Sequence, residues 1–167
     1  MNKVIFFIGT LSNGGAERVV SNLSLHMAKN INKKILLFGS SCKVEYPYEG
    51  DLVFLDKINE KNIFYKAYAL FKRIREIKLL KRKNPKVPVI SFLEYPNLIN
   101  ALTRKYGKTI LSVRNHMSTK HSKGVKACFW GFTIKHLYSK ADLIIAVSQE
   151  IKRDLIDNYG LDEKKIK

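Results

Sequence analysis

Short, uninterrupted apolar runs alternate along this chain with longer segments in which apolar residues recur every three or four positions. An uninterrupted run predicts a strand buried on both faces, and the longer spacing predicts a helix with one face on a sheet. The runs that predict strands are residues 4–8, 35–38, 52–55, 87–92, 109–113 and 142–147. The segments that predict helices are residues 16–27, 62–82, 97–106, 125–139 and 149–159. Strands that alternate with helices predict an open α/β domain, a parallel sheet with helices on both faces.

The predicted helix at residues 62–82 is basic as well as amphipathic. Its apolar stripe, which we expect to face the sheet, consists of Phe64, Ala67, Tyr68, Phe71, Ile74 and either Ile77 or Lys78. Its basic side chains, opposed by Glu76 alone, are Lys66, Lys72, Arg73, Arg75, Lys78, Lys81, Arg82 and Lys83. These charges favour one of three surroundings: water, an anionic membrane surface or the phosphates of a nucleic acid.

The charge of the whole chain is concentrated in its middle. The 167 residues include 31 Lys and Arg against 14 Asp and Glu, a net charge of +17. Residues 61–140 hold 19 of the basic residues with only Glu76 and Glu94 as acids, and the rest of the chain is neutral. A region this basic favours an anionic partner such as nucleic acid, acidic lipid or a phosphorylated substrate.

The remaining composition is that of one ordinary globular domain, with 46% hydrophobic and 27% charged residues. Cys42 and Cys128 are too few for a disulfide scaffold and predict free thiols in a reducing compartment. The apolar start at residues 3–8 is shorter than a signal peptide requires. No apolar run approaches the ~20 residues that span a bilayer. We therefore expect a soluble or surface-bound protein.

A second basic and aromatic group lies near the helix predicted at residues 125–139. Its members are Lys120, Lys123, Lys126, Phe129, Trp130 and Phe132. Trp and Tyr favour the boundary between membrane and water, and the sequence has no helix-turn-helix, RRM, KH or OB signature. We therefore expect an anionic membrane partner and no nucleic acid, although a nucleic-acid-binding module stays an alternative. The expected membrane-surface residues are Lys72, Arg73, Arg75, Lys78, Arg82 and Trp130.

Gly14 and Gly15 lie where the first predicted strand leads into the first predicted helix. Exposed N–H groups and the helix dipole attract phosphate at such a position, and glycine lets the backbone approach closely. The spacing matches neither the G-x-G-x-x-G fingerprint nor the P-loop. A flexible turn without a ligand explains the pattern equally well.

Further polar residues follow the fourth and fifth predicted strands, at the edge where open sheets bind ligands. Arg114, Asn115 and His116 follow one strand, and His116 can exchange a proton near neutral pH. Glu94 follows the other strand and either orients a substrate hydroxyl or caps a helix that starts at Asn97. His116 can equally be a loop histidine bonded to backbone. Weaker candidates are His26, His121 and His136, and no histidine pair with a carboxylate predicts a metal site.

Three segments resemble the glycosyltransferases of family 4. Residues 14–19, Gly-Gly-Ala-Glu-Arg-Val, resemble the family's "GGAER" turn, and residues 112–116, Ser-Val-Arg-Asn-His, resemble its "S-x-R-N-H" segment. Residues 141–148 and 158–167 resemble its "AD-IIAVSE…FG…KI" region. The resemblance implies that residues 1–167 are the N-terminal, acceptor-binding domain of a GT-B enzyme. Such a domain is a Rossmann-like open parallel sheet that forms one half of the GT-B fold.

The resemblance also implies a function. Enzymes of this family transfer a sugar from a nucleotide-sugar donor to an acceptor hydroxyl, with retention of configuration and without a metal or other cofactor. The donor-binding domain, with its E-x7-E motif, lies outside these residues, so we expect this chain alone to be inert. A hexosyltransferase of surface polysaccharide synthesis, such as capsule or lipopolysaccharide, is the expected whole enzyme.

By resemblance, each candidate residue has an expected role. Gly14 and Gly15 would contact the donor diphosphate, and His116 is the catalytic candidate that contacts the transferring sugar or acceptor. The expected acceptor-binding residues are Arg114, Asn115, Glu94, Asn97, Lys120 and Lys123, the two lysines meeting a phosphate of a lipid carrier. We expect a glycan or polyprenyl-diphosphate-linked acceptor and a cytoplasmic protein, peripheral on the inner face of the cell membrane. A free-standing dinucleotide enzyme is the weakest alternative, because Gly39-Ser40-Ser41 offers no acid to hold a ribose.

Overall fold

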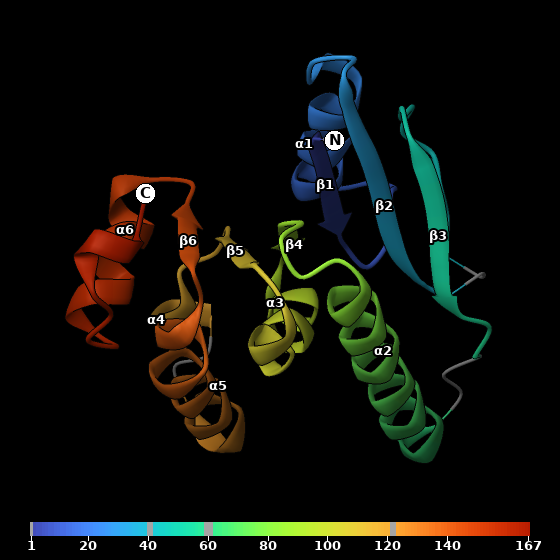
Figure 1. Ribbon diagram of the computed structural model, residues 1–167. Coiled ribbons are helices and arrows are strands. Elements are labelled where there is room, and N and C mark those ends of the chain that lie inside the picture. Colours follow the sequence, from blue (N-terminus) through green and yellow to red (C-terminus); the bar gives the residue numbers. More distant parts are fainter. Residues whose placement is uncertain (1, 40–41, 59–61, 121–122) are drawn as a thin grey trace.

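The computed structural model of the protein describes residues 2–39, 42–58, 62–120 and 123–167. Its centre is a parallel sheet of six strands in the order β3-β2-β1-β4-β5-β6 (Figure 1). The strands are β1 Asn2–Phe7, β2 Ile31–Gly39, β3 Asp51–Asp56, β4 Val89–Phe92, β5 Thr109–Val113 and β6 Leu143–Ala146. This arrangement confirms the predicted Rossmann-like α/β fold.

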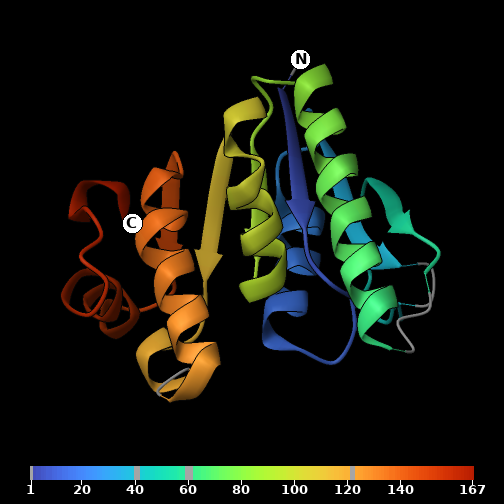
Figure 2. The same cartoon turned by 90° about the horizontal axis from the view of Figure 1, so that it is seen from below.

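Helices cover both faces of the sheet. They are α1 Gly15–His26, α2 Ile63–Lys83, α3 Glu94–Leu102, α4 Met117–Lys120, α5 Gly124–His136 and α6 Gln149–Asp157. Figure 2 shows α2, α3 and α5 in front of the sheet and α1 behind it. Because all strands are parallel, their carboxyl ends and the loops that follow them meet along one edge.

The uninterrupted apolar run of β1 is explained by burial on both faces. Phe6 and Ile8 pack with Val20 of α1 on one side of the sheet. Ile5 and Phe7 lie in a second cluster on the other side, beneath α2 and α3. Each successive side chain therefore enters a different core, as expected for a strand at the centre of a doubly covered sheet.

The start of α3 and the presence of α4 differ from the sequence-based prediction. α3 begins at Glu94, directly after Leu93, whose backbone has a φ of 71°. The segment expected to be a loop contains the short helix α4. The amides of Met117 and Ser118 at its start donate hydrogen bonds to Asp154 of α6. A distant acceptor therefore stabilises a helix that local residue preferences do not predict.

The predicted apolar stripe of α2 is confirmed at Ile74 and Ile77, which pack against the core, and is wrong at its aromatic residues. Phe64 and Phe71 are 81% and 67% exposed, and Tyr68 is also exposed. The face that meets the sheet instead buries Ala69, Arg73, Ile77 and Lys81. Hydrophobic periodicity assigns the aromatic residues to the core, because it cannot know that two buried cations find polar partners there.

Lys81 is completely buried at the end of α2 that lies near the amino ends of the strands. Its ammonium donates hydrogen bonds to Thr109 Oγ1 at 2.6 Å and to the Asn100 carbonyl at 3.1 Å. Burial lowers the pKa of Lys81 to about 7, although the charge of Asp142 opposes this shift. The folded protein therefore releases a proton that the unfolded chain keeps up to about pH 10.

We predict that Lys81→Met flattens the dependence of stability on pH. Between pH 7 and about 10 the unfolded state binds one more proton at this site than the native state. The wild-type free energy of unfolding therefore rises there by roughly 1 kcal/mol for each pH unit from this group. Urea unfolding followed by circular dichroism from pH 6 to 10 measures the slope. Lys83→Met, at an exposed neighbouring position, is the control, and equal slopes in wild type and Lys81→Met would contradict the prediction.

Candidate functional site

A narrow cleft lies at the carboxyl edge of the sheet, between the segments that follow β4 and β5. Four predicted site residues, Glu94, Asn97, Arg114 and Asn115, line it together with Leu93, Val113, Met117 and Tyr138. The structure thus brings together residues from two separate segments of the sequence. The enclosed space is about 10 Å³, which holds one water molecule at most, so a larger ligand has to bind on the rim.

Glu94 is the polar centre of the rim. Its Oε1 accepts hydrogen bonds from Asn115 Nδ2 at 2.9 Å and from Lys120 Nζ at 2.6 Å. Burial acts to raise the pKa of Glu94, but the hydrogen bonds from Lys120 and Asn115 outweigh it and lower the pKa. Glu94 is therefore a carboxylate at neutral pH, and it neutralises the Lys120 ammonium that the sequence assigned to a ligand phosphate.

Asn97 lies beneath the cleft with its amide bonded on both sides. It accepts a hydrogen bond from Ser91 Oγ at 2.7 Å and donates one to the Ser112 carbonyl at 2.9 Å. These bonds connect α3 to β4 and β5, so the amide orients the floor of the cleft. Tyr138, which the sequence did not single out, completes that floor and lies 3.5 Å from the Glu94 carbonyl. The one signal in the sequence for Tyr138 is its position at the end of the helix predicted at residues 125–139.

His116 lies beside this cleft and its side chain is 44% exposed. Its Nδ1 is 3.9 Å from the Oδ2 of Asp154, an almost completely buried side chain of α6. The same oxygen accepts the Met117 amide at 2.8 Å and the Ser118 amide at 3.3 Å. Asp154 therefore holds the segment that carries His116. No motif in the sequence singles out Asp154, although it lies about one helical turn after Ile151 on the buried face of α6.

The hydrogen bonds also set the ionisation of Asp154. Burial acts to raise its pKa, but hydrogen bonds from Ser118, Asn158 and Met117 outweigh burial and lower it. Asp154 is therefore charged at neutral pH, and its charge lies at the N-terminal end of α4, where the free amides favour an anion.

Gly14 and Gly15 lie at the start of α1, along the same edge of the sheet. Gly14 is the N-cap residue, and Gly15 is exposed with open space where a Cβ would be. At Gly14 a Cβ would collide with the carboxylate of Glu17. The carboxylate therefore covers the helix end where the sequence predicts a phosphate site, and an incoming phosphate would have to displace it.

Two of the expected membrane-surface residues are corrected by the structure. Arg73 is buried, where its Nε donates a hydrogen bond to Asp56 at 2.6 Å and its guanidinium stacks on the Phe38 ring at 4.2 Å. Trp130 is buried in the core between α5 and the sheet. Both predictions of surface exposure are wrong, because a long amphipathic side chain is also suited to bridge a helix and a sheet.

The other four basic residues expected at the membrane surface are exposed or partly exposed. Lys78 and Arg82 both lie 4.8 Å from the centre of the Tyr106 ring. Arg75 is exposed and Lys72 is half-buried. These four side chains form the basic face of α2, and Lys123 is exposed where α5 begins.

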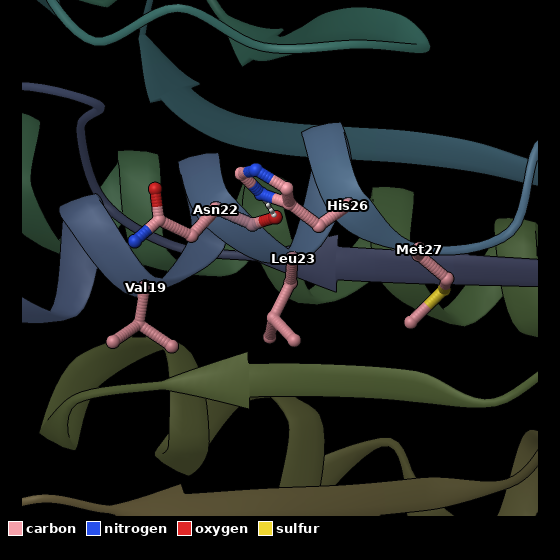
Figure 3. A pocket seen from close by; sticks show the side chains of 5 residues that line it. All are labelled: Val19, Asn22, Leu23, His26 and Met27. Atoms are coloured by element: carbon pink, nitrogen blue, oxygen red, sulfur yellow. Dashed lines mark hydrogen bonds between the residues drawn. The ribbon is translucent and has the colours of Figure 1, made fainter.

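A separate open hollow of about 360 Å³ lies along α1, lined by Val19, Asn22, Leu23, His26 and Met27 (Figure 3). The His26 ring makes a hydrogen bond to the Asn22 carbonyl at 2.9 Å. Because α1 runs back toward the amino ends of the strands, this hollow lies away from the cleft. His136 contacts Phe132 on α5, and His121 is outside the described residues.

Among the described residues no three His, Cys, Asp or Glu side chains gather in a way that could hold a metal ion. Over the same residues, no helix combines the length and the apolar character needed to cross a bilayer.

We predict that Asp154→Ala destabilises the protein by about 1–3 kcal/mol, because the buried Met117 amide loses its acceptor. Hydrogen exchange at Met117 and Ser118 should accelerate. Because the folded pKa of Asp154 is lowered, its contribution is present above about pH 4 and fades as the pH falls further. Urea unfolding and amide exchange measure these effects. Asp157→Ala, at an exposed position of the same helix, is the control, and equal exchange in both variants would contradict the prediction.

Comparison with known proteins gives relatives that are about twice as long as this chain. The family model described as Glycosyltransferase Family 4 matches residues 13–167. A protein of Campylobacter jejuni is 30% identical over 99% of this chain and 46% of its own length. It is named N-acetylgalactosamine-N,N'-diacetylbacillosaminyl-diphospho-undecaprenol 4-alpha-N-acetylgalactosaminyltransferase. A second protein of that organism, 25% identical over 91% of this chain and 42% of its own length, is named a GalNAc-alpha-(1->4)-GalNAc-alpha-(1->3)-diNAcBac-PP-undecaprenol alpha-1,4-N-acetyl-D-galactosaminyltransferase.

Solved structures show the same fold. The apo form of the lipopolysaccharide outer core galactosyltransferase WaaB has a TM-score of 0.65 at 18% identity, over 99% of this chain and 44% of that one. The UDP-N-acetylglucosamine 2-epimerase of Rickettsia bellii has a TM-score of 0.64 at 14% identity, over the same shares. A transferase and an epimerase match equally well, so the fold alone does not decide the chemistry. The family model does decide the ancestry, since it covers nearly the whole chain, and this chain belongs to glycosyltransferase family 4.

Proposed function

We propose that this chain is the acceptor-binding domain of a retaining, metal-independent glycosyltransferase. The whole enzyme transfers a hexose from a nucleotide-sugar to a hydroxyl of a polyprenyl-diphosphate-linked glycan. The observation that carries the proposal is the cleft at the carboxyl edge in a member of this family: Glu94 and Asn115 line it, Lys120 is bonded to Glu94, and His116 follows Asn115 in the sequence. Both relatives from Campylobacter jejuni are named for acceptors on diphospho-undecaprenol, which supports this acceptor class.

The residues of the cleft divide into two groups in this proposal. His116, held near Asp154, contacts the reacting sugar hydroxyl, and Glu94 orients the acceptor with Arg114 and Asn115 beside it. Lys120 and Lys123 meet the diphosphate of the carrier. Because Lys120 is bonded to Glu94 in the free protein, binding of the carrier exchanges one anionic partner of this lysine for another.

The donor side of the proposal rests on α1. The exposed amides at Gly14 and Gly15 bind the donor diphosphate once Glu17 turns away from the helix end. The chain spans less than half the length of the relatives, so we assign most of the nucleotide-binding surface to a second domain outside these residues. We infer that residues 1–167 are inert without it.

The product is a surface glycan assembled on its lipid carrier, such as a capsule or lipopolysaccharide chain. We propose that the enzyme acts at the inner face of the cell membrane, on an acceptor anchored there by its lipid. The basic face of α2 supports this location, because Lys72, Arg75, Lys78 and Arg82 point away from the core. Each exposed Lys or Arg contributes about 1 kcal/mol near acidic lipid.

We predict that His116→Ala lowers kcat by roughly 10²-fold, the usual contribution of one positioned acid–base or polar group. The assay uses the complete gene product that contains these residues, a panel of labelled UDP- and GDP-sugars, and a polyprenyl-diphosphate-linked glycan, with EDTA present. Nuclear magnetic resonance of the product gives its anomeric configuration. His26→Ala, on the distant hollow of α1, is the control and should retain activity. Inversion of configuration, loss of activity in EDTA, or full activity of His116→Ala would each contradict one part of the proposal.

We predict that the 167-residue chain co-sediments with vesicles rich in phosphatidylglycerol at low salt and is released at high salt. The double variant Lys72→Glu and Arg75→Glu should weaken this binding at least several-fold, because four units of charge change on the basic face. Lys29→Glu with Lys108→Glu, which alters exposed lysines elsewhere, is the charge-matched control. Strong, salt-dependent binding to random duplex DNA without vesicle binding would instead favour a nucleic-acid-binding module.

A further inference from the structure

A second opening lies at the carboxyl edge of the sheet, between the first half of α2 and the start of α3. It is a groove of about 480 Å³, within the range of about 300–1,000 Å³ that is usual for sites of small organic ligands. Its lining residues are Phe38, Ile63, Lys66, Ala67, Leu70, Arg73, Tyr95 and Ile99. The groove is therefore distinct from the narrow cleft around Glu94, which holds one water molecule at most.

The walls of the groove are apolar. Ile63, Ala67 and Leu70 recur at helical spacing along one face of α2, and Tyr95 and Ile99 line the groove from α3. The step from Ile63 to Leu70 extends about 10 Å along the helix, so the groove is elongated along α2. Such a shape and lining suit a hydrocarbon chain.

The base of the groove is polar but carries no net charge. Arg73, at the base, is bonded to Asp56 at 2.6 Å and stacks on Phe38 at 4.2 Å. The carboxylate neutralises the guanidinium, so this pair does not form a binding site for an anion inside the groove. Lys66, by contrast, is exposed on the rim, where a negatively charged head group can meet it.

Two residues that line the groove, Ile63 and Tyr95, are unusually exposed to water for large apolar side chains. Ile63 is 71% exposed and Tyr95 is 61% exposed. Large apolar side chains that gather around an opening mark a binding surface rather than ordinary surface variation. A hydrocarbon ligand would remove both from water, and burial of apolar surface gives about 25 cal/mol per Å².

The groove and the cleft are joined through α3. Tyr95 lines the groove, and its sequence neighbour Glu94 lines the cleft and binds Lys120. A ligand with a hydrocarbon chain in the groove can therefore extend its charged head toward Lys66 and the cleft. A polyprenyl diphosphate has these two parts in this order.

We propose that the groove between α2 and α3 binds the isoprene units next to the diphosphate of the lipid-linked acceptor. This inference rests on the proposed function, because the acceptor class comes from there. It adds a specific contact to the lipid itself: the carrier is recognised by its chain as well as by its diphosphate and glycan. The chain leaves the bilayer locally and lies along α2.

The only tryptophan of the chain, Trp130, provides a probe of this groove. Its ring centre lies 5.8 Å from that of Tyr95, edge to face, so a ligand that shifts Tyr95 changes the surroundings of Trp130. We expect a saturable fluorescence change when the 167-residue chain is titrated with monomeric farnesyl diphosphate. Inorganic diphosphate and dodecyl phosphate should bind at least tenfold more weakly, since the first lacks the chain and the second lacks the methyl branches and one phosphate. Equal binding of either control would overturn the proposal, reassigning the groove to phosphate or to acyl chains.

Three variants locate the site. Ala67→Phe fills the groove and Ile63→Ser removes one wall, so each should weaken farnesyl diphosphate binding by about tenfold. Phe64→Ser is the matched control, because Phe64 is the adjacent, highly exposed residue that does not line the groove. It should bind within about twofold of wild type. Thermal unfolding checks that each variant is folded. If Ala67→Phe does not fold, Ile63→Ser still tests the groove. Weakening by Phe64→Ser as strong as by Ile63→Ser would overturn the proposal in favour of a general apolar surface.

A second measurement separates this proposal from the proposed function. The complete gene product is assayed with the prenylated acceptor and with the water-soluble glycosyl diphosphate that lacks the chain. Ala67→Phe should raise KM for the prenylated acceptor about tenfold and leave KM for the soluble one unchanged. Unchanged KM values for both acceptors would overturn the proposal that the groove binds the isoprene units, but not the proposal that the enzyme transfers a sugar. Absence of transfer by the wild type to either acceptor would overturn the proposed function instead.

Discussion

Burial of β1 on both faces is the constraint from which the rest of the structure follows. Ile5 and Phe6 are adjacent in the sequence and almost completely buried in opposite directions. Helices therefore cover both faces. All neighbouring strands are parallel, so each connection runs back over a face of the sheet and every segment that follows a strand begins at one edge. The cleft, the start of α1 and the groove beside α2 share that edge for this reason.

Buried charged side chains hold the helices at three places, and two of these places shape the candidate sites. Arg73 with Asp56 forms the base of the groove, and Asp154 holds the start of α4 next to His116. Lys81 lies at the opposite edge, where it bonds β5 and α3 to α2. Burying a charge is costly unless it is paired or hydrogen-bonded. The energy of these contacts therefore fixes helix positions more specifically than apolar packing alone would.

The two openings at the carboxyl edge and the basic face of α2, which extends toward the opposite edge, combine three properties that suit one amphiphilic ligand. The cleft offers a carboxylate, an amide and a lysine for hydroxyl and phosphate groups. The groove offers an apolar wall, and the basic face of α2 offers charge to a lipid head group. Glu94 and Tyr95 connect the first two, since these neighbours line the cleft and the groove respectively. In the proposed function, this continuity lets one acceptor contact the protein from its sugar to its lipid chain.

The sequence by itself determined the class of the fold and the edge at which the candidate site lies. Mainly apolar runs located all six strands, because most side chains of a strand that is covered on both faces pack against apolar neighbours. The segments after β4 and β5 then had to meet, which brought Glu94, Asn97, Arg114 and Asn115 together. The sequence also placed its turn glycines correctly at the start of α1.

Only the tertiary structure decided which face of α2 is buried, and it placed Arg73 inward and Phe64, Tyr68 and Phe71 outward. The spacing of apolar residues along a helix shows which side chains are apolar, but it does not show which polar partner a buried side chain will find. The partner of Arg73, Asp56, lies 17 positions away in the sequence. Asp154 was missed for the same reason, since its bonds to Met117 and Ser118 cross more than 30 residues of sequence. Local patterns predict which segments are buried, whereas pairs of polar groups distant in sequence become visible only when the chain is folded.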